Sequence, residues 1–191
     1  AFYEGQLMIA PVNEANDYGA EAVNWHQIDG NWDNQTNIVE AEAVIEFLLE
    51  NLPKEKENFD TTLWGIVTFN QKQSDLLIDL LQKKLEEKRS QKELTDVEKE
   101  IWEWCLGGRS TTKFIWIKNL ENVQGDEVQK LIISVAYGID EKMGRVANRF
   151  GLLNQEGGDK RLNVAITRAQ EKIDVFCSFD PDTDLEVSST T

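Results

Sequence analysis

Two arginines in the C-terminal part of the chain have the type and spacing needed to bind a phosphate. Arg161 and Arg168 lie seven positions apart, in a stretch whose apolar residues have helical spacing. Seven residues make about two helical turns, so both guanidinium groups are expected to leave the same side of a helix. A planar, permanently charged fork matches phosphate oxygens. The pair therefore predicts an anion site, with a nucleotide phosphate as the leading candidate.

A second polar stretch lies upstream, at Gln124, Gly125, Asp126 and Glu127. It separates the apolar runs 114–117 and 131–135, which have the pattern of buried strands. A glycine in such a turn lets the backbone come close to a ligand. The turn is therefore a second candidate binding element.

A third polar group follows the mostly apolar segment 62–69, which is predicted to be a strand. Thr68, Asn70 and Gln73 fall at its carboxyl end, and a helix with leucines at core spacing comes next. In open parallel sheets, ligands bind at the carboxyl edge. Two interpretations stay open for these side chains, namely contact with a ligand and capping of the following helix.

These stretches occur in the order found in a known family. Residues 123–127, followed by 161–169, resemble motifs V and VI of superfamily 1 helicases, in the branch of the nonsense-mediated-decay helicase. Residues 65–73 resemble motif IV, while 2–7 and 37–41 resemble neighbouring family segments. Order and rough spacing agree over most of the chain, which makes the resemblance much stronger than a single motif would.

The resemblance implies a role for each residue of motifs V and VI. Arg168 corresponds to the arginine finger, and Arg161 supports the same cluster or anchors the motif through a carboxylate. Glu127 corresponds to the acceptor of a ribose hydroxyl, and Gly125 to a close backbone approach near the terminal phosphate. Gln124 would link the nucleotide to the face that holds the nucleic acid. Through motif IV, the resemblance also places Thr68, Asn70 and Gln73 in contact with nucleic acid or nucleotide.

ATP hydrolysis needs parts that this sequence does not show. It has no Gly-x-x-x-x-Gly-Lys-Ser/Thr loop and no recognisable Asp-Glu metal motif. In the family, an upstream RecA-like domain of the same polypeptide supplies them, and the second domain closes over ATP and Mg²⁺. The chain is therefore expected to be inactive alone. The expected track is single-stranded DNA or RNA, gripped alternately by the two domains.

Alternating strands and helices predict an α/β fold, with a parallel sheet covered on both faces, as in a RecA-like domain without the Walker A loop. We expect one domain over residues 1–191, with a frayed tail at 180–191. Residues from about 83 to 113 are dense in charge and predict a helical insertion. Two interpretations of it stay open, a lid or docking arm and a solvated surface excursion.

Composition limits the function further. A net charge of -15 disfavours nucleic-acid binding by bulk electrostatics, although 20 Lys and Arg residues leave room for a local basic stripe. No apolar stretch is long enough to span a membrane, so no membrane partner is expected. Cys105 and Cys177 lack a metal-ligand pattern, which favours a reduced, cytoplasmic setting and no metal site. The sole histidine, His26, has no nucleophile nearby and is interpreted as a structural or surface histidine.

Three function classes follow. The leading one is the second motor domain of an ATP-dependent helicase or translocase. The second is a non-catalytic interaction module, which the presence of Gln124, Glu127 and Arg168 disfavours. The third is part of a nuclease-fused restriction or repair protein, for which the sequence offers no clustered Asp/Glu-x-Lys pattern.

Overall fold

A mostly parallel β-sheet forms the middle layer of the computed structural model, which describes residues 22–53, 64–106, 115–123, 125, 127–140, 143–146, 150–181 and 183–184. Within these residues, five parallel strands lie in the order β1-β7-β5-β3-β4. Two short strands extend β5, β2 in parallel and β6 antiparallel. The strands are β1 (Val23–Gln27), β2 (Asn31–Trp32), β3 (Trp64–Thr68), β4 (Ile115–Asn119), β5 (Val128–Asp140), β6 (Arg145–Val146) and β7 (Ala169–Ser178).

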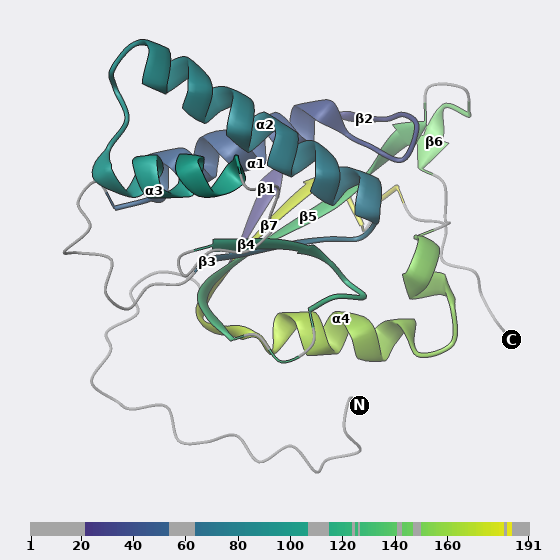
Figure 1. Ribbon diagram of the computed structural model, residues 1–191. Coiled ribbons are helices and arrows are strands. Elements are labelled where there is room, and N and C mark those ends of the chain that lie inside the picture. The colour runs from purple at the N-terminus through teal and green to yellow at the C-terminus, as the bar shows by residue number, and fades with distance from the viewer. Residues whose placement is uncertain are drawn as a thin grey trace, which may run out of the picture.

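Helices cover both faces of this sheet (Figure 1). Three of them, α1, α2 and α3, form the layer on one face, and α4 lies on the other face after the short 3-10 helix η3. The predicted α/β architecture, with helices on both sides of a parallel sheet, is confirmed. The helices are α1 (Ile38–Asn51), α2 (Gln71–Ser90), α3 (Asp96–Cys105), η3 (Gly151–Asn154) and α4 (Gly158–Ile166).

Successive strand residues point to two separate apolar layers, as the period of a β-strand requires. Ile66 of β3 and Ile132 of β5 pack in the layer under α1, α2 and α3. Their neighbours Val67 and Ile133 pack in the layer that includes Ala165 of α4. All five of these residues are buried. The central strands are thus apolar on both sides, which explains why their sequences are apolar runs without alternation.

Local sequence determines where helix α1 begins. Asn37 caps the helix, and its side-chain oxygen accepts a hydrogen bond from the backbone N–H of Glu40 at 3.1 Å. The helix runs to Asn51, and Leu52 ends it in an extended conformation ahead of Pro53. Four apolar residues at helical spacing bury its inner face, namely Ala41, Val44, Ile45 and Leu48.

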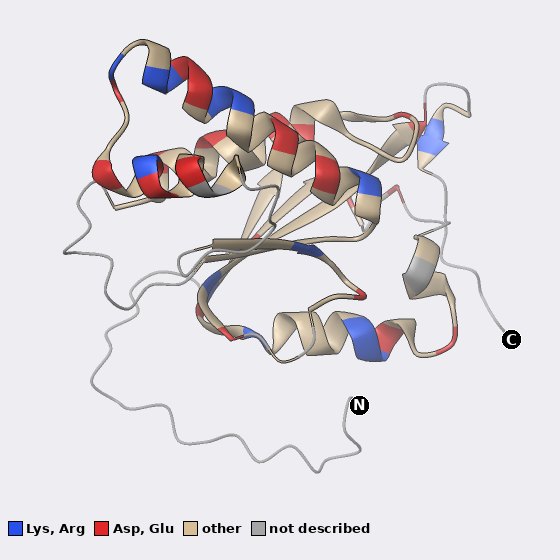
Figure 2. Cartoon of the chain, in the orientation of Figure 1, with Lys and Arg blue, Asp and Glu red and all other residues tan. Residues whose placement is uncertain are grey.

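Helix α3 opens with a capping box. The Thr95 hydroxyl accepts from the backbone N–H of Glu98 at 3.2 Å, and the Glu98 carboxylate accepts from the N–H of Thr95 at 2.8 Å. Glu98 is buried and also forms an ion pair with Lys88 of α2. This pairing ties α3 against α2, and acidic and basic side chains alternate along both helices (Figure 2).

Several boundaries differ from the sequence-based expectation. Strand β5 extends over Val128–Asp140, well beyond the predicted 131–135. The segment expected as an insertion from about residue 83 begins within α2, and Val97 and Ile101 of α3 belong to the main core. Residues 107–113 and the resemblance at 2–7 lie outside the described residues. Most of the expected tail, from 185 onward, lies outside them as well.

Candidate functional site

The Gly125 turn lies at the amino edge of the sheet, just before β5. Gly125 has φ +90°, a left-handed conformation that favours glycine, and a Cβ added there would meet no atom within 4 Å. Glu127 follows it, with an exposed side chain that accepts a hydrogen bond from Gln170 Nε2 at 2.9 Å. The turn therefore offers an unobstructed backbone and an exposed carboxylate. Gln124 lies outside the described residues, so its predicted role stays a prediction.

Arg168 lies directly beside this turn. Its carbonyl oxygen accepts from the backbone N–H of Val128 at 2.9 Å, which joins the start of β5 to the start of β7. The half-exposed guanidinium donates from Nε to the Val164 carbonyl at 2.9 Å and from NH2 to the Thr167 hydroxyl at 3.2 Å. These bonds use two of the five N–H donors of a guanidinium, at the helix C-terminus where a cation is favourable.

Arg161 does not share this position. Helix α4 ends at Ile166, so Arg168 lies beyond its last turn and the two arginines are not carried on one continuous helix. Arg161 lies in the first half of α4, and its NH1 reaches back to the Glu156 carbonyl at 3.5 Å. Seven helical residues would rise roughly 10 Å. Arg161 and Arg168 therefore lie toward opposite ends of the same helix.

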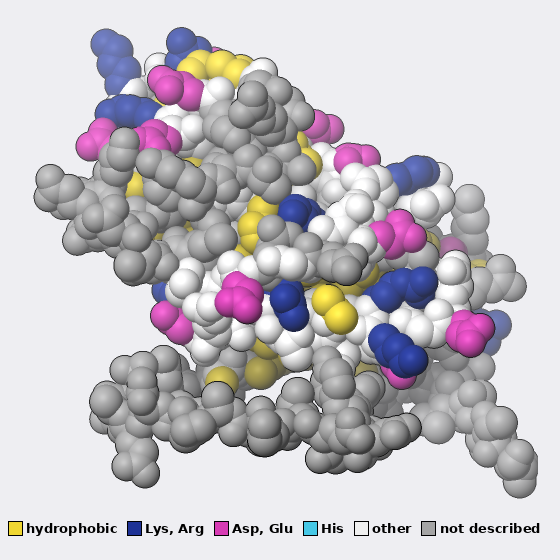
Figure 3. All heavy atoms as spheres, turned by 60° about the horizontal axis from the view of Figure 1, so that its bottom comes forward, with side chains coloured by type: hydrophobic (Ala, Val, Ile, Leu, Met, Phe, Trp, Pro, Cys, Tyr) yellow, Lys and Arg dark blue, Asp and Glu magenta, His cyan; other side chains and the backbone are white. Residues whose placement is uncertain are grey.

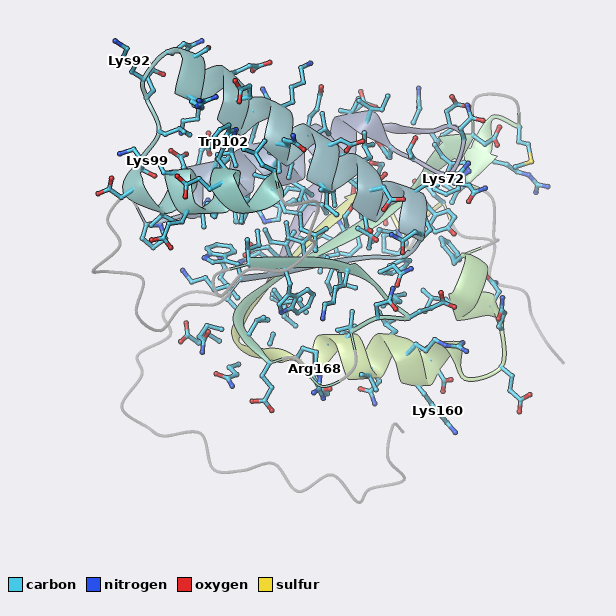
Figure 4. The ribbon with its side chains drawn as sticks, viewed as in Figure 1. Lys72, Lys92, Lys99, Trp102, Lys160 and Arg168 are labelled. Carbon is cyan, nitrogen blue, oxygen red and sulfur yellow. The ribbon has the colours of Figure 1, made fainter. Side chains whose placement is uncertain are left out.

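The face that carries α4 is mixed in character. Val164 and Ile166 are exposed, although both are apolar. Figure 3, in which this side of the molecule comes forward, shows Lys and Arg side chains close to exposed hydrophobic ones, with some carboxylates between them. Figure 4 labels Arg168 and Lys160 on α4 and the turn after it, across the sheet from α2 and α3. Cations and apolar groups together suit a surface that closes over a charged ligand.

The polar group predicted from motif IV lies at the other edge of the sheet. Thr68 is fully buried, and its hydroxyl donates to the Asn70 carbonyl at 2.7 Å. Asn70 caps α2, and its side-chain oxygen accepts from the backbone N–H of Gln73 at 3.0 Å. The capping interpretation is therefore confirmed for Asn70. Its Nδ2 is buried without a hydrogen-bond partner in the described part of the chain.

Gln73 is fully buried, and its side chain forms hydrogen bonds within the domain. Its Oε1 accepts from the Asn37 N–H at 2.9 Å, and its Nε2 donates to the Asn37 carbonyl and to Ser134 Oγ, both at 3.2 Å. Thr68 and Gln73 thus have internal partners. The nucleic-acid contacts predicted for their side chains stay predictions, and the structure gives both residues a positioning role at this edge.

A buried carboxylate, which the sequence-based reasoning missed, organises the same edge. Glu40 accepts hydrogen bonds from Ser134 Oγ and Ala136 N at 2.7 Å, and from Ser178 Oγ at 3.0 Å. Ala136 has φ +69°, and the pairing of β5 with β7 shifts register between Ser134 and Gly138. Glu40 therefore holds an irregular part of β5. Burial raises its pKa to about 7, although all three hydrogen bonds act in the opposite direction.

A groove of about 490 Å³ opens beside this edge, between the start of α2 and the end of β4. Asn119 crosses it, donating from Nδ2 to Gln71 Oε1 at 2.9 Å. Asp75 and Asp79 line the groove opposite the single cation Lys118. Because two carboxylates face it, this groove is unfavourable for a phosphate backbone.

The predicted site residues thus divide between two edges. Gly125, Glu127 and Arg168 meet at the amino edge, whereas Thr68, Asn70 and Gln73 cluster at the carboxyl edge. In β5, Val128 pairs with Ala169 at the amino edge, and Ser134 pairs with Thr68 at the carboxyl edge. Six residues of strand span roughly 20 Å, so the two groups cannot contact the same small ligand.

Membrane-spanning helices and metal-binding clusters are both absent from the part of the chain that the structure describes. No helix there is long and apolar enough to cross a membrane. No group of three or more His, Cys, Asp or Glu side chains there is arranged to hold a metal ion.

Comparison with known proteins matches residues 2–180 to the model of an AAA domain family. The chain is 32% identical over 174 residues to the uncharacterized ATP-dependent helicase MG140 of Mycoplasma genitalium, covering 91% of this chain and 14% of that protein. It is 34% identical over 149 residues to the MG140 homolog of Mycoplasma pneumoniae, covering 78% of this chain and 12% of that protein. The chain thus spans only about one seventh of the length of these relatives. It belongs to this AAA domain family and is a C-terminal RecA-like domain of the superfamily 1 helicase type.

Proposed function

We propose that this domain forms one wall of the ATP site of a helicase or translocase, and that Arg168 is its arginine finger. The observation that carries the proposal is the backbone hydrogen bond between Val128 and Arg168, which brings the Gly125 turn and the guanidinium to one edge of the sheet. An upstream RecA-like domain of the same polypeptide would form the opposite wall. The helicase names of the two mycoplasma relatives support this proposal.

The residues at this edge fit a nucleoside triphosphate. The open space beside Gly125 leaves room for a phosphate to approach the backbone, and the exposed Glu127 carboxylate can accept from a ribose hydroxyl. ATP bound with Mg²⁺ supplies the phosphoryl group that is transferred to water. Arg168 would stabilise the negative charge that develops during this transfer, and Gln124 would connect the nucleotide side to the nucleic-acid side.

Arg161 has a different place in this proposal. It lies in the first half of α4, whereas Arg168 follows the end of the helix, and the Nη1 of Arg161 is directed to the Glu156 carbonyl. It would therefore anchor the segment that leads into α4, and contact the nucleotide only indirectly. This differs from the anchoring alternative that the resemblance left open, in which the partner of Arg161 would be a carboxylate.

Single-stranded DNA or RNA would run along the carboxyl edge, because the nucleotide occupies the amino edge. Asn70 and Lys72 lie at the start of α2 on this edge, and Lys72 Nζ lies 3.3 Å from the carbonyl of Asn34. Trp32 stacks on Tyr137 close by, with ring centroids 4.3 Å apart, and is partly exposed. A cation and a partly exposed aromatic ring at the same edge suit a strand of bases and phosphates better than the acidic groove does. Thr68 and Gln73 would act by positioning Asn70.

The cytoplasm is the location we propose. Its support is that Cys105 and Cys177 are both free and buried, and that burial raises the pKa of their thiols to about 11 and about 12. Thiols of this kind are unreactive and need no oxidising compartment.

The test restores the upstream phosphate-binding domain and measures ATPase activity with and without single-stranded nucleic acid. Arg168→Ala is expected to lower turnover by about a thousandfold or more, as loss of an arginine finger does. Lys160→Ala is the matched control, since Lys160 is an exposed cation on α4. Equal ATP turnover in the parent and in Arg168→Ala would refute the assignment of Arg168 as the arginine finger. An absence of ATPase activity in the parent would favour a non-catalytic interaction module.

A further inference from the structure

A hollow between α2 and α3 lies apart from the candidate residues at both edges of the sheet. It has a volume of about 410 Å³ and lies where the end of α2 faces α3. Figure 4 labels Lys92, Lys99 and Trp102 in this region. The residues around the hollow are Arg89, Lys92, Leu94, Lys99, Trp102 and Glu103.

The lining combines an apolar surface with positive charge. Trp102 and Leu94 are partly buried and pack against the main core. The Arg89 guanidinium carbon lies 4.1 Å from the centre of the Trp102 ring. Three cations, Arg89, Lys92 and Lys99, line the hollow together with the carboxylate of Glu103, in a chain whose net charge is -15. Two further carboxylates, Glu86 and Asp96, lie beside the hollow as ion-pair partners of Arg89 and Lys99, so an anionic ligand would compete with them for these cations.

Existing contacts orient this lining, and the Arg89 guanidinium lies over the Trp102 ring. Trp102 Nε1 donates to the Glu86 carboxylate at 3.0 Å, which fixes the plane of the indole ring. Arg89 pairs with Glu86 at 3.4 Å, and Lys99 with Asp96 at 2.8 Å. In each of these ion pairs, both side chains are more than half exposed. Exposed pairs of this kind are weak, so a phosphate can replace the carboxylate partner.

We propose that this hollow binds a segment of single-stranded nucleic acid, with a base near the ring of Trp102 and phosphates on Lys92 and Lys99. A base can stack on the exposed Arg89 guanidinium that lies over the indole, whereas an acidic peptide would use only the charges. The inference rests on the proposed function for the identity of the ligand. The rise of α2 puts Arg89 roughly 25 Å from Lys72, so this contact is separate from the track at the carboxyl edge.

The test measures binding of fluorescent oligothymidylate and oligouridylate to the 191-residue chain by anisotropy, over a range of salt concentrations. The double variant Lys92→Ala/Lys99→Ala is expected to weaken binding roughly tenfold at low salt and to reduce the salt slope by about 1.4, because each phosphate contact to a single strand contributes about 0.7. Trp102→Leu is expected to weaken binding by on the order of tenfold through lost stacking, with little change in the salt slope.

The matched control is Lys83→Ala/Lys84→Ala, which removes the same charge from α2 outside the hollow. Unchanged affinity and slope in the Lys92/Lys99 variant, or an effect no larger than that of the control, would overturn the proposal. So would a lack of oligonucleotide binding by the parent chain, or displacement of the oligonucleotide by polyglutamate that binds more tightly to the same residues. The ATPase test of Arg168 does not depend on any of these results, so failure here leaves the proposed function standing.

Discussion

Ionisation of Glu40 is predicted to make the stability of this domain depend on pH. Its carboxylate is fully buried and accepts three hydrogen bonds, yet burial raises its pKa from 4.5 to about 7. The folded state therefore binds this proton more tightly than the unfolded state does. The stability contributed by this difference is fully present below about pH 4.5, and it is lost as the pH rises through about 7.

The magnitude follows from the shift. The pKa rises from 4.5 to about 7, which is roughly 2.5 units. Each unit corresponds to 1.36 kcal/mol, so the unfolding free energy should change by about 3 kcal/mol. Glu40→Gln keeps the shape and removes the charge. The parent should therefore lose about 3 kcal/mol of unfolding free energy relative to Glu40→Gln between pH 4.5 and a pH well above 7.

The assay is urea unfolding followed by tryptophan fluorescence, with linear extrapolation at each pH. Glu42→Gln is the matched control, because Glu42 lies exposed on the same helix. A stability difference between the parent and Glu40→Gln that does not vary with pH would show that the buried carboxylate does not retain its proton. The reasoning about this edge of the sheet would then fail.

Two further substitutions test the packing. Gly65→Ala would place a Cβ 2.5 Å from the ring of Trp116, and it should lower the unfolding free energy by about 1–3 kcal/mol in urea titrations; a neutral effect would show that the ring moves aside freely. Thr95→Ala removes the capping hydroxyl of α3 and should cost about 0.5–2 kcal/mol, whereas Ser90→Ala, at an exposed hydroxyl near the end of α2, should cost less. Equal effects of the two substitutions would contradict the capping role of Thr95.

The helix starts were the most predictable part of the fold, because local chemistry determines them. Asn37 and Thr95 each lie three residues before a glutamate, and both act as caps in the structure. What the spacing did not reveal is that the two glutamates differ. Glu98 reaches back to its cap, whereas Glu40 turns away and binds β5 and β7. Those partners lie 94 and 138 positions away, and no local pattern indicates such contacts.

The sequence suggested candidate residues for the site, but not their arrangement. Motif order identified Gly125, Glu127 and Arg168, which the structure brings to one edge. Helical spacing wrongly suggested one continuous helix from Arg161 to Arg168, since apolar periodicity does not show that α4 ends at Ile166. The hollow around Trp102 was missed because its lining comes from two helices and the turn between them, which only tertiary packing brings together.

Strands β5 and β7 connect the two edges directly. β7 begins next to Arg168 and ends at Ser178, whose hydroxyl donates to Glu40. β5 begins next to Glu127 and carries Ser134 and Ala136, which also bind Glu40. Packed strands transmit displacement with little compression. Under the proposed function, a movement of Arg168 on closure of an upstream domain would therefore carry the carboxyl edge with it as one body, and a nucleic acid at that edge would move without any change inside the domain.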